Sequence, residues 1–190
     1  MGVVSVLAVD SGYPLCAVAA TDKSSRIYAV GSASVYDERP EWLFDTPAER
    51  FERAIIEVPT MRGDATPNPE DLLLIAVSGV RLAQRFAGVF GSVYEVRPSE
   101  WKGNTPKPAH HARTLWPALD AAERKLLGGD KTARAIELAC ERGASDRWSK
   151  PGARYYRASE LPIVGGVKIT HDILDASTLA LYDLRRIKKG

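Results

Sequence analysis

The sequence has few cysteines, no long apolar run and no leader-like start, and each absence narrows the classes of protein that it can belong to. No apolar stretch approaches the length needed to span a bilayer, so no membrane partner is expected. The first residues do not combine a basic region with a cleavable apolar segment, which argues against secretion. The two cysteines, Cys16 and Cys140, lack metal-ligand spacing and are expected to be small core residues in a reducing cytoplasm.

What remains is the composition of an ordinary globular domain with an uneven distribution of charge. The 190 residues are 45% apolar and 26% charged, which suits a single domain over residues 1–190, with no repeat or linker to divide it. The net charge is +2, yet residues 97–157 hold 13 Lys and Arg against 7 Asp and Glu, a local excess of +6. This split favours a polyanionic partner on one side of the molecule, although solvated helix faces would give the same count.

Residues 3–12 are the stretch around which the chain is organised. An almost unbroken apolar run, with Val6-Leu7-Ala8-Val9 at its centre, ends in Asp10 and Gly12. The lack of alternation predicts a strand that is buried on both faces in the middle of a sheet. A carboxylate at the end of such a strand is costly unless a positive group lies beside it. Asp10 is therefore either a turn residue before Gly12 or a metal ligand.

The rest of the pattern predicts an α/β domain. Two further strands, joined by a polar turn at 22–25, would complete an antiparallel meander with the first strand. The second half is mostly helical except for residues 144–170, which we interpret as an insertion interrupted by Pro and Gly. The further strands are expected at 15–21, 27–35, 54–59 and 92–96, and the helices at 70–86, 107–116, 121–127, 130–142 and 172–187.

Four acidic residues stand out because they interrupt apolar segments. If the first and fourth strands are parallel neighbours, Asp10 and Glu57 emerge side by side, while Asp172 and Asp175 share one face of the last helix. Clustered carboxylates repel one another, whereas two Mg²⁺ or Mn²⁺ ions would relieve the repulsion and clamp a phosphodiester for in-line attack by water. The alternative for Asp172 and Asp175 is a favourable interaction with the N-terminus of their helix.

Four segments in a fixed order carry a resemblance to a known family. They are Val6-Leu7-Ala8-Val9-Asp10-Ser11-Gly12, Ile55-Ile56-Glu57-Val58-Pro59, Val96-Arg97-Pro98-Ser99-Glu100-Trp101-Lys102-Gly103 and His171-Asp172-Ile173-Leu174-Asp175-Ala176. With them the chain resembles the RuvC family of Holliday junction resolvases, most closely its phage-borne members, within the ribonuclease H-like fold. The resemblance implies a five-stranded mixed sheet in the order 3-2-1-4-5, with the first strand central and helices on both faces. It also implies that Asp10, Glu57, Asp172 and Asp175 are the catalytic set, with two Mg²⁺ or Mn²⁺ ions per site.

The function implied by this resemblance is metal-dependent cleavage of four-way DNA junctions by a homodimer in the cytoplasm, that of the host if a phage encodes the chain. Flaps, other branched DNA or RNA are the alternative substrates. The chain departs from the family in the short segment 37–53 between the third and fourth strands and in the insertion at 144–170. An actin-like ATPase or sugar kinase also opens with an apolar strand and an Asp near a Gly, but it needs a second such half. A junction-binding protein without catalysis would not need the carboxylates.

Basic and aromatic residues outside the carboxylate set are candidates for DNA contact. Lys102 and Lys107 are placed to hold phosphates, and Trp101 either stacks on an unpaired base or packs in the core. His171 either joins the site or is a capping or surface histidine. The predicted DNA-binding residues, with the first two entering the junction core and the last four belonging to the insertion, are Met61, Arg62, Trp101, Lys102, Lys107, Arg113, Arg147, Lys150, Arg154 and Arg157.

The helix at 70–86 is the expected dimer interface. It is apolar over more of its circumference than one contact with a sheet requires. We expect Leu73, Val80 and Ala83 to face the sheet. The residues expected near the interface are Leu74, Val77, Arg81 and Arg85.

Overall fold

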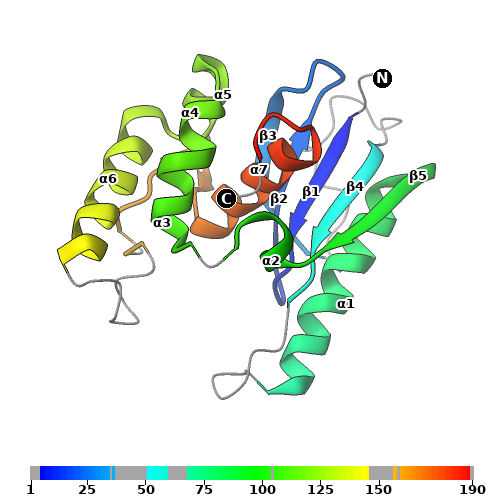
Figure 1. Ribbon diagram of the computed structural model, residues 1–190. Coiled ribbons are helices and arrows are strands. Elements are labelled where there is room, and N and C mark those ends of the chain that lie inside the picture. Colours follow the sequence, from blue (N-terminus) through cyan, green and yellow to red (C-terminus); the bar gives the residue numbers. More distant parts are fainter. Residues whose placement is uncertain are drawn as a thin grey trace.

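The computed structural model describes residues 5–34, 36, 51–59, 68–103, 105–145, 156, 157 and 159–188, and its centre is a five-stranded sheet (Figure 1). The strands lie in the order β3-β2-β1-β4-β5. β1 is antiparallel to β2 and parallel to β4; β3 is antiparallel to β2, and β5 is parallel to β4. The strands are β1 (Val6–Asp10), β2 (Cys16–Thr21), β3 (Ile27–Ala33), β4 (Phe51–Glu57) and β5 (Ala87–Val96).

This strand order and polarity are those of a ribonuclease H-like sheet, so the predicted fold class is confirmed. The predicted antiparallel meander is present, and β1 is the central strand. All five residues of β1 are buried, as its unbroken apolar run indicated. The parallel pairing of β1 with β4, on which the convergence of Asp10 and Glu57 depends, is also confirmed.

Successive side chains of β1 point to opposite faces of the sheet and so enter two separate cores. Val6 and Ala8 belong to the core that includes the helix α7 (His171–Asp183). Leu7 and Val9 belong to the core that includes Leu82 of the helix α1 (Pro69–Phe86). Helices therefore cover both faces of the sheet, as expected for this fold, and Asp10 points to the α7 side because it continues the alternation of Val6 and Ala8.

The short helices between β5 and α7 lie on the α7 side, away from α1 (Figure 1). From the end of β5 the chain passes through these helices and returns to α7 through a small hairpin. They are α2 (Pro98–Trp101), α3 (Lys107–His110), the π-helical turn η3 (His111–Leu115), α4 (Trp116–Ala118), α5 (Ala121–Leu126) and α6 (Gly129–Ser145). The hairpin strands are β6 (Ile163–Val164) and β7 (Val167–Lys168).

Several predicted boundaries differ from the structure, and the largest difference is in the helix expected at 107–116. A π-helical turn interrupts it, and the following turn contains Pro117. Proline cannot donate a hydrogen bond to the carbonyl of Arg113, and its ring crowds that carbonyl, so a regular helix cannot continue through this point. The prediction missed the effect of Pro117 on the residues before it.

Other predictions were also wrong, for two helix ends and for the orientation of one residue. Gly143 does not stop α6, which continues to Ser145, and α7 ends at Asp183, short of the predicted Ile187. Leu73, which we expected to face the sheet, has 64% of its surface exposed. The contact with the sheet is made further along α1, where Leu82 and Ala83 are buried in the core shared with β1 and β4. None of the helices described here is both long and apolar enough to cross a membrane.

Candidate active site

The parallel strands β1 and β4 end side by side and present two acids to the α7 side of the sheet. Asp10 and Glu57 are register partners on these strands, and each has 8% of its surface exposed. Asp172 and Asp175 occupy the first turns of α7. Thr170 caps the N-terminus of this helix, and its hydroxyl accepts a hydrogen bond from the Ile173 N–H. One carboxylate oxygen each from Asp10, Asp172 and Asp175 lies within 4.8 Å of the other two.

Two lysines from the segment after β5 bridge these carboxylates. Lys102 Nζ lies 2.9 Å from the Glu57 carboxylate and 3.0 Å from Asp175 Oδ2. Lys107 Nζ lies 2.7 Å from Asp175 Oδ2 and 3.0 Å from Asp172 Oδ1. Glu57 thus joins the cluster through Lys102, and the structure brings all four predicted acids together. The expected contact of these two lysines with phosphate stays a prediction, because their ammonium groups bind carboxylates here.

Trp101 is a buried partner of Glu57. The turn of α2 begins at Pro98, and the Lys102 N–H donates to its carbonyl, which sets Trp101 and Lys102 beside the end of β4. The Trp101 side chain is 1% exposed and its Nε1–H donates to Glu57 Oε2 over 2.8 Å. The Lys102 ammonium lies 4.8 Å from the centre of the Trp101 ring. Of the two roles considered, the structure has Trp101 in the core, with its ring covered and not open to a base.

His111 binds Asp175 through the carboxylate oxygen that the two lysines do not share. Its Nε2 lies 2.8 Å from Asp175 Oδ1, and its Nδ1 lies 2.8 Å from the hydroxyl of Tyr156. His111 is completely buried. Neither residue was among the predicted site residues, because His111 follows another histidine and Tyr156 lies in a segment without a core pattern. A histidine on a helix that also carries Lys107 four residues earlier was the available signal.

The electrostatics of the cluster divide the four acids into two kinds. Burial, together with the charges of Glu57 and Asp175, raises the pKa of Asp10 well above its usual range. Burial also raises the pKa of Glu57, against the opposing effect of Lys102. Burial acts the same way on Asp175, but Lys107, the hydrogen bond from His111 and Lys102 outweigh it and hold the pKa of Asp175 well below its usual range. Asp175 is therefore the firmly ionised member of the set.

The lysines and the histidines respond to the same surroundings. Burial opposes the charge of Lys102 and Lys107, yet the neighbouring acids, led by Asp175, raise the pKa of both ammonium groups. Burial lowers the pKa of His111, and burial with the nearby His111 lowers the pKa of His110 to about 4. The lysines are therefore charged and the two histidines neutral at pH 7.

The residues present fit a divalent cation bound through oxygen. Asp10 Oδ2 is buried and has no hydrogen-bond partner among the residues that the structure describes, although a buried carboxylate oxygen normally has one. Asp10 points toward Asp172 and Asp175, whose oxygens complete a group of three. The four carboxylates carry four negative charges when ionised, and Lys102 and Lys107 balance two of them. Hard cations such as Mg²⁺ and Mn²⁺ prefer such oxygen ligands.

The remaining predicted site residues are spread more widely. Arg113 and Arg157 are exposed, and His171 lies beside the site with Nε2 3.2 Å from Asp172 Oδ1. Burial and Lys107 lower the pKa of His171. The predicted DNA contacts that fall outside the described residues are Met61, Arg62, Arg147, Lys150 and Arg154.

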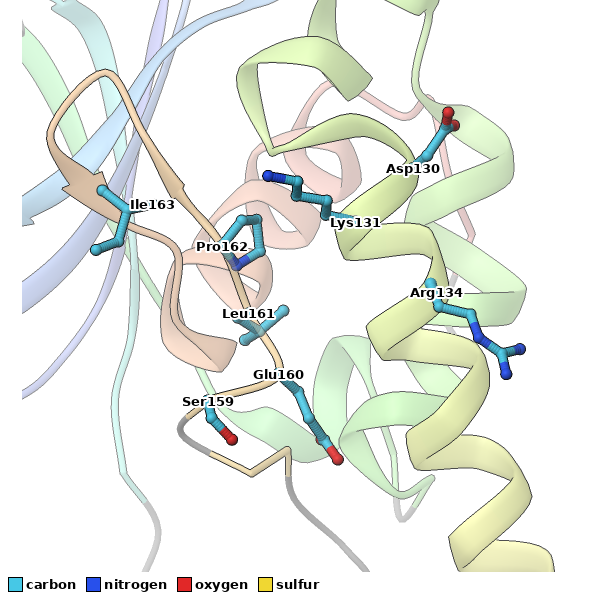
Figure 2. A pocket seen from close by; sticks show the side chains of 8 residues that line it. All are labelled: Asp130, Lys131, Arg134, Ser159, Glu160, Leu161, Pro162 and Ile163. Atoms are coloured by element: carbon cyan, nitrogen blue, oxygen red, sulfur yellow. The ribbon is translucent and has the colours of Figure 1, made fainter.

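A separate hollow of about 510 Å³ lies between α6 and residues 159–163 (Figure 2). Its lining includes Asp130, Lys131 and Arg134 of α6 and Glu160, so it presents charges of both signs. The three α6 side chains are exposed. This hollow therefore selects no particular ligand charge and is not part of the carboxylate cluster.

Comparison with known proteins gives a distant likeness in structure. The sequence matches no protein-family profile and no curated protein. It is similar to a solved structure described as "Thermus thermophilus RuvC structure", with 12% sequence identity and a TM-score of 0.36, over 98% of this chain and 99% of that one. An identity this low says nothing about activity, which has to be argued from the side chains of the site.

Proposed function

We propose that this protein is a metal-dependent endonuclease that hydrolyses phosphodiester bonds in branched DNA, with four-way junctions as its substrate. The observation that carries the proposal is the convergence of Asp10, Glu57, Asp172 and Asp175 at one edge of a ribonuclease H-like sheet, with a buried oxygen of Asp10 that has no partner among the described residues. Such an oxygen is costly to bury unless something positive binds it. The arrangement is therefore built to receive a cation.

The residues of the chain have distinct roles in this proposal. Asp10, Asp172 and Asp175 would hold Mg²⁺ or Mn²⁺, and Glu57 would complete the set beside them, with two ions per site. A divalent ion bound there supplies Lewis acidity and lowers the pKa of water that attacks a phosphodiester. Trp101 and Lys102 fix the Glu57 carboxylate, while Lys102 and Lys107 fix Asp175. The two ammonium groups also limit the negative charge that an incoming phosphate meets.

The distribution of positive charge supports a nucleic acid as the substrate. The basic excess of residues 97–157 lies in the segment that forms α2 to α6, and these helices lie on the same side of the sheet as the carboxylates. A polyanion drawn to this side would meet the catalytic edge. Junctions are favoured over flaps, other branched DNA or RNA by the motif resemblance, and a homodimer would present two such sites to a two-fold symmetric junction.

Cleavage assays on matched junction, flap, duplex and RNA substrates test this proposal. We expect Asp10→Asn, Glu57→Gln and Asp175→Asn each to abolish cleavage while junction binding persists, because each removes a carboxylate of the metal site and no phosphate contact. Asp172→Asn should be severely impaired, EDTA should stop the wild-type reaction, and Mg²⁺ or Mn²⁺ should restore it. Asp130→Asn, a change of an exposed acid on α6, is the matched control. Cleavage by Glu57→Gln at the wild-type rate would overturn the site assignment.

A further inference from the structure

A hydrogen-bonded chain of three side chains runs from the insertion to the carboxylate cluster. The Tyr156 hydroxyl lies 2.8 Å from His111 Nδ1, and His111 Nε2 lies 2.8 Å from Asp175 Oδ1. The Tyr156 and His111 rings are stacked, with centroids 5.8 Å apart and an interplanar angle of 14°. His111 is 0% and Asp175 1% exposed, so water does not take the place of either contact.

The donor and the acceptor of each hydrogen bond in this series follow from the charge of Asp175, its last member. Asp175 is paired with two lysines and is ionised, so its oxygens can only accept. His111 Nε2 must therefore carry the proton that it donates to Asp175. In a neutral imidazole the other nitrogen then has a free lone pair, and it accepts from the Tyr156 hydroxyl. The Tyr156 hydroxyl thus selects the tautomer of His111 that binds Asp175.

The two oxygens of Asp175 are consequently held from different sides. Oδ1 accepts from His111, and Oδ2 receives both Lys102 and Lys107. Rotation of the carboxylate would break contacts on both sides at once. The orientation in which Asp175 faces Asp10 and Asp172 is therefore fixed before any cation arrives.

Tyr156 is itself held by the insertion that carries it. Glu160 accepts two hydrogen bonds from the guanidinium of Arg142 on α6, at 2.6 and 3.0 Å, and one from the Arg157 N–H at 2.8 Å. The Arg142 and Glu160 side chains are 18% and 13% exposed, so this pair is largely shielded from solvent. It ties Arg157 and Glu160 to α6, next to the point where Tyr156 meets His111.

We propose that His111 and Tyr156 are positioning residues that orient Asp175 for the divalent cation, and that the insertion at 144–170 thereby contributes to metal affinity. This inference rests on the proposed function only in taking Asp175 as a metal ligand. Hydrogen-bonding partners of metal ligands commonly change metal affinity by roughly 10–100-fold when removed. The insertion then serves the catalytic edge directly through Tyr156, in addition to any contact that its basic residues make with DNA.

The test is the Mn²⁺ affinity of the full-length protein, measured by calorimetric titration without any nucleic acid. We expect His111→Leu to weaken Mn²⁺ binding by roughly 10–100-fold, because it removes the donor to Asp175 while keeping an apolar side chain of similar size. His111→Gln should recover most of the loss, because its amide can donate to Oδ1 as Nε2 does. Tyr156→Phe should weaken binding several-fold with the ring retained. Tyr94→Phe, at a half-exposed position on β5, is the matched control and should bind Mn²⁺ as the wild type does.

The outcomes separate this inference from the proposed function. A wild-type protein that binds no Mn²⁺ would remove the metal site and with it the proposed function. A wild type that binds, with His111→Leu and Tyr156→Phe binding equally well, would overturn the positioning inference and leave the function standing. An equal loss in His111→Leu and His111→Gln with none in Tyr156→Phe would assign His111 to packing and also overturn it. If His111→Leu does not fold, His111→Gln and Tyr156→Phe decide the question.

Discussion

At the scale of single residues, Asp10 shows what the proposed cation site would cost in stability. Its carboxylate is buried, one oxygen has no partner in the described part of the chain, and its neighbours include Glu57 and Asp175. Burial and these charges raise its pKa, so above that pKa the folded state is penalised in full. The penalty diminishes as the pH falls through the raised pKa, because protonation removes the charge. Function and stability therefore make opposite demands on this residue.

Asp10→Asn should accordingly stabilise the metal-free protein. The amide carries no charge and can donate to the neighbouring carboxylates, so we expect the melting temperature in EDTA at pH 7 to rise. Each kcal/mol gained is worth roughly 2–4 °C in a chain of this size. Addition of Mn²⁺ should raise the melting temperature of the wild type and not that of the variant. Thermal melts with and without Mn²⁺ measure both effects.

The control for this prediction is Asp130→Asn, which removes an exposed acid from α6 and should leave both melting temperatures as in the wild type. A lower melting temperature for Asp10→Asn than for the wild type in EDTA would contradict the interpretation that the buried Asp10 carboxylate destabilises the protein when no cation is bound.

At the scale of secondary-structure elements, Glu123 joins three parts of the molecule. It is 1% exposed and accepts hydrogen bonds from the Ile27 N–H of β3, the Asp120 N–H that precedes α5, and the Arg186 guanidinium that follows α7. Burial raises its pKa, but Arg186 and the backbone N–H groups outweigh burial and lower it. The stabilisation is therefore complete above the unfolded-state pKa and is lost as the pH falls through the lower folded-state pKa.

Glu123→Gln should destabilise the protein at pH 7 by about 1–3 kcal/mol, the range for hydrogen bonds that involve charged groups. The difference from the wild type should shrink as the pH falls below about 4.5, because the unfolded wild-type chain then takes up a proton on Glu123 while the folded protein stays ionised down to its lower pKa. Urea unfolding at pH 7 and at pH 4 measures this difference. Glu137→Gln is the control, since its pair with Arg134 is exposed on both sides. An equal gap at both pH values would exclude the ionised pair as its cause.

Elements with a strong local pattern could be predicted from the sequence, and elements set by distant contacts could not. The apolar run of β1 and the acids that end β1 and β4 were sufficient to predict the central strand and the meeting of Asp10 with Glu57. The π-helical turn at 111–115 depends on Pro117, and the hairpin of β6 and β7 is only two residues on each side. Such short elements carry too little pattern to be recognised.

The candidate site was predictable to a similar degree. The four acids were found because each breaks an apolar context, which is a local signal. Tyr156 and His111 were missed because their roles arise from tertiary packing between the insertion and η3. Core packing of Trp101 was one of the two roles predicted, but its bond to Glu57 and that of Lys102 were not foreseen, because the sequence does not show that both residues bind Glu57.

At the scale of the whole molecule, the two sides of the sheet have different character. The carboxylate edge and the basic helices lie on the α7 side, whereas α1 lies on the other (Figure 1). Near the start of α1, Leu73 and Leu74 are 64% and 43% exposed. Exposed leucines in adjacent positions favour burial against a second molecule. A partner on the α1 side would leave the basic side open to DNA.

We therefore predict a homodimer through α1. Sedimentation of the purified protein at micromolar concentration should give the mass of two chains, and Leu74→Glu should shift it to one chain because a carboxylate would be buried in the interface. Gln84→Glu, an exposed position on the same helix, is the control and should leave the dimer intact. A wild type that is a monomer, and remains one with junction DNA bound, would remove the dimeric resolvase and leave a nuclease for flaps or other branched DNA.

The sources of the carboxylate cluster also determine when the protein becomes active during its synthesis. Asp10 and Glu57 come from strands made early, while Asp172 and Asp175 come from α7, which the ribosome makes long afterwards. The sheet can begin to pair before α7 exists, but the oxygens that complete the cation site cannot be supplied until that helix docks on β1 and β2. The proposed nuclease activity would then be among the last properties that a nascent chain acquires. A nascent chain that still lacks α7 would therefore not cleave the nucleic acid near it on the ribosome.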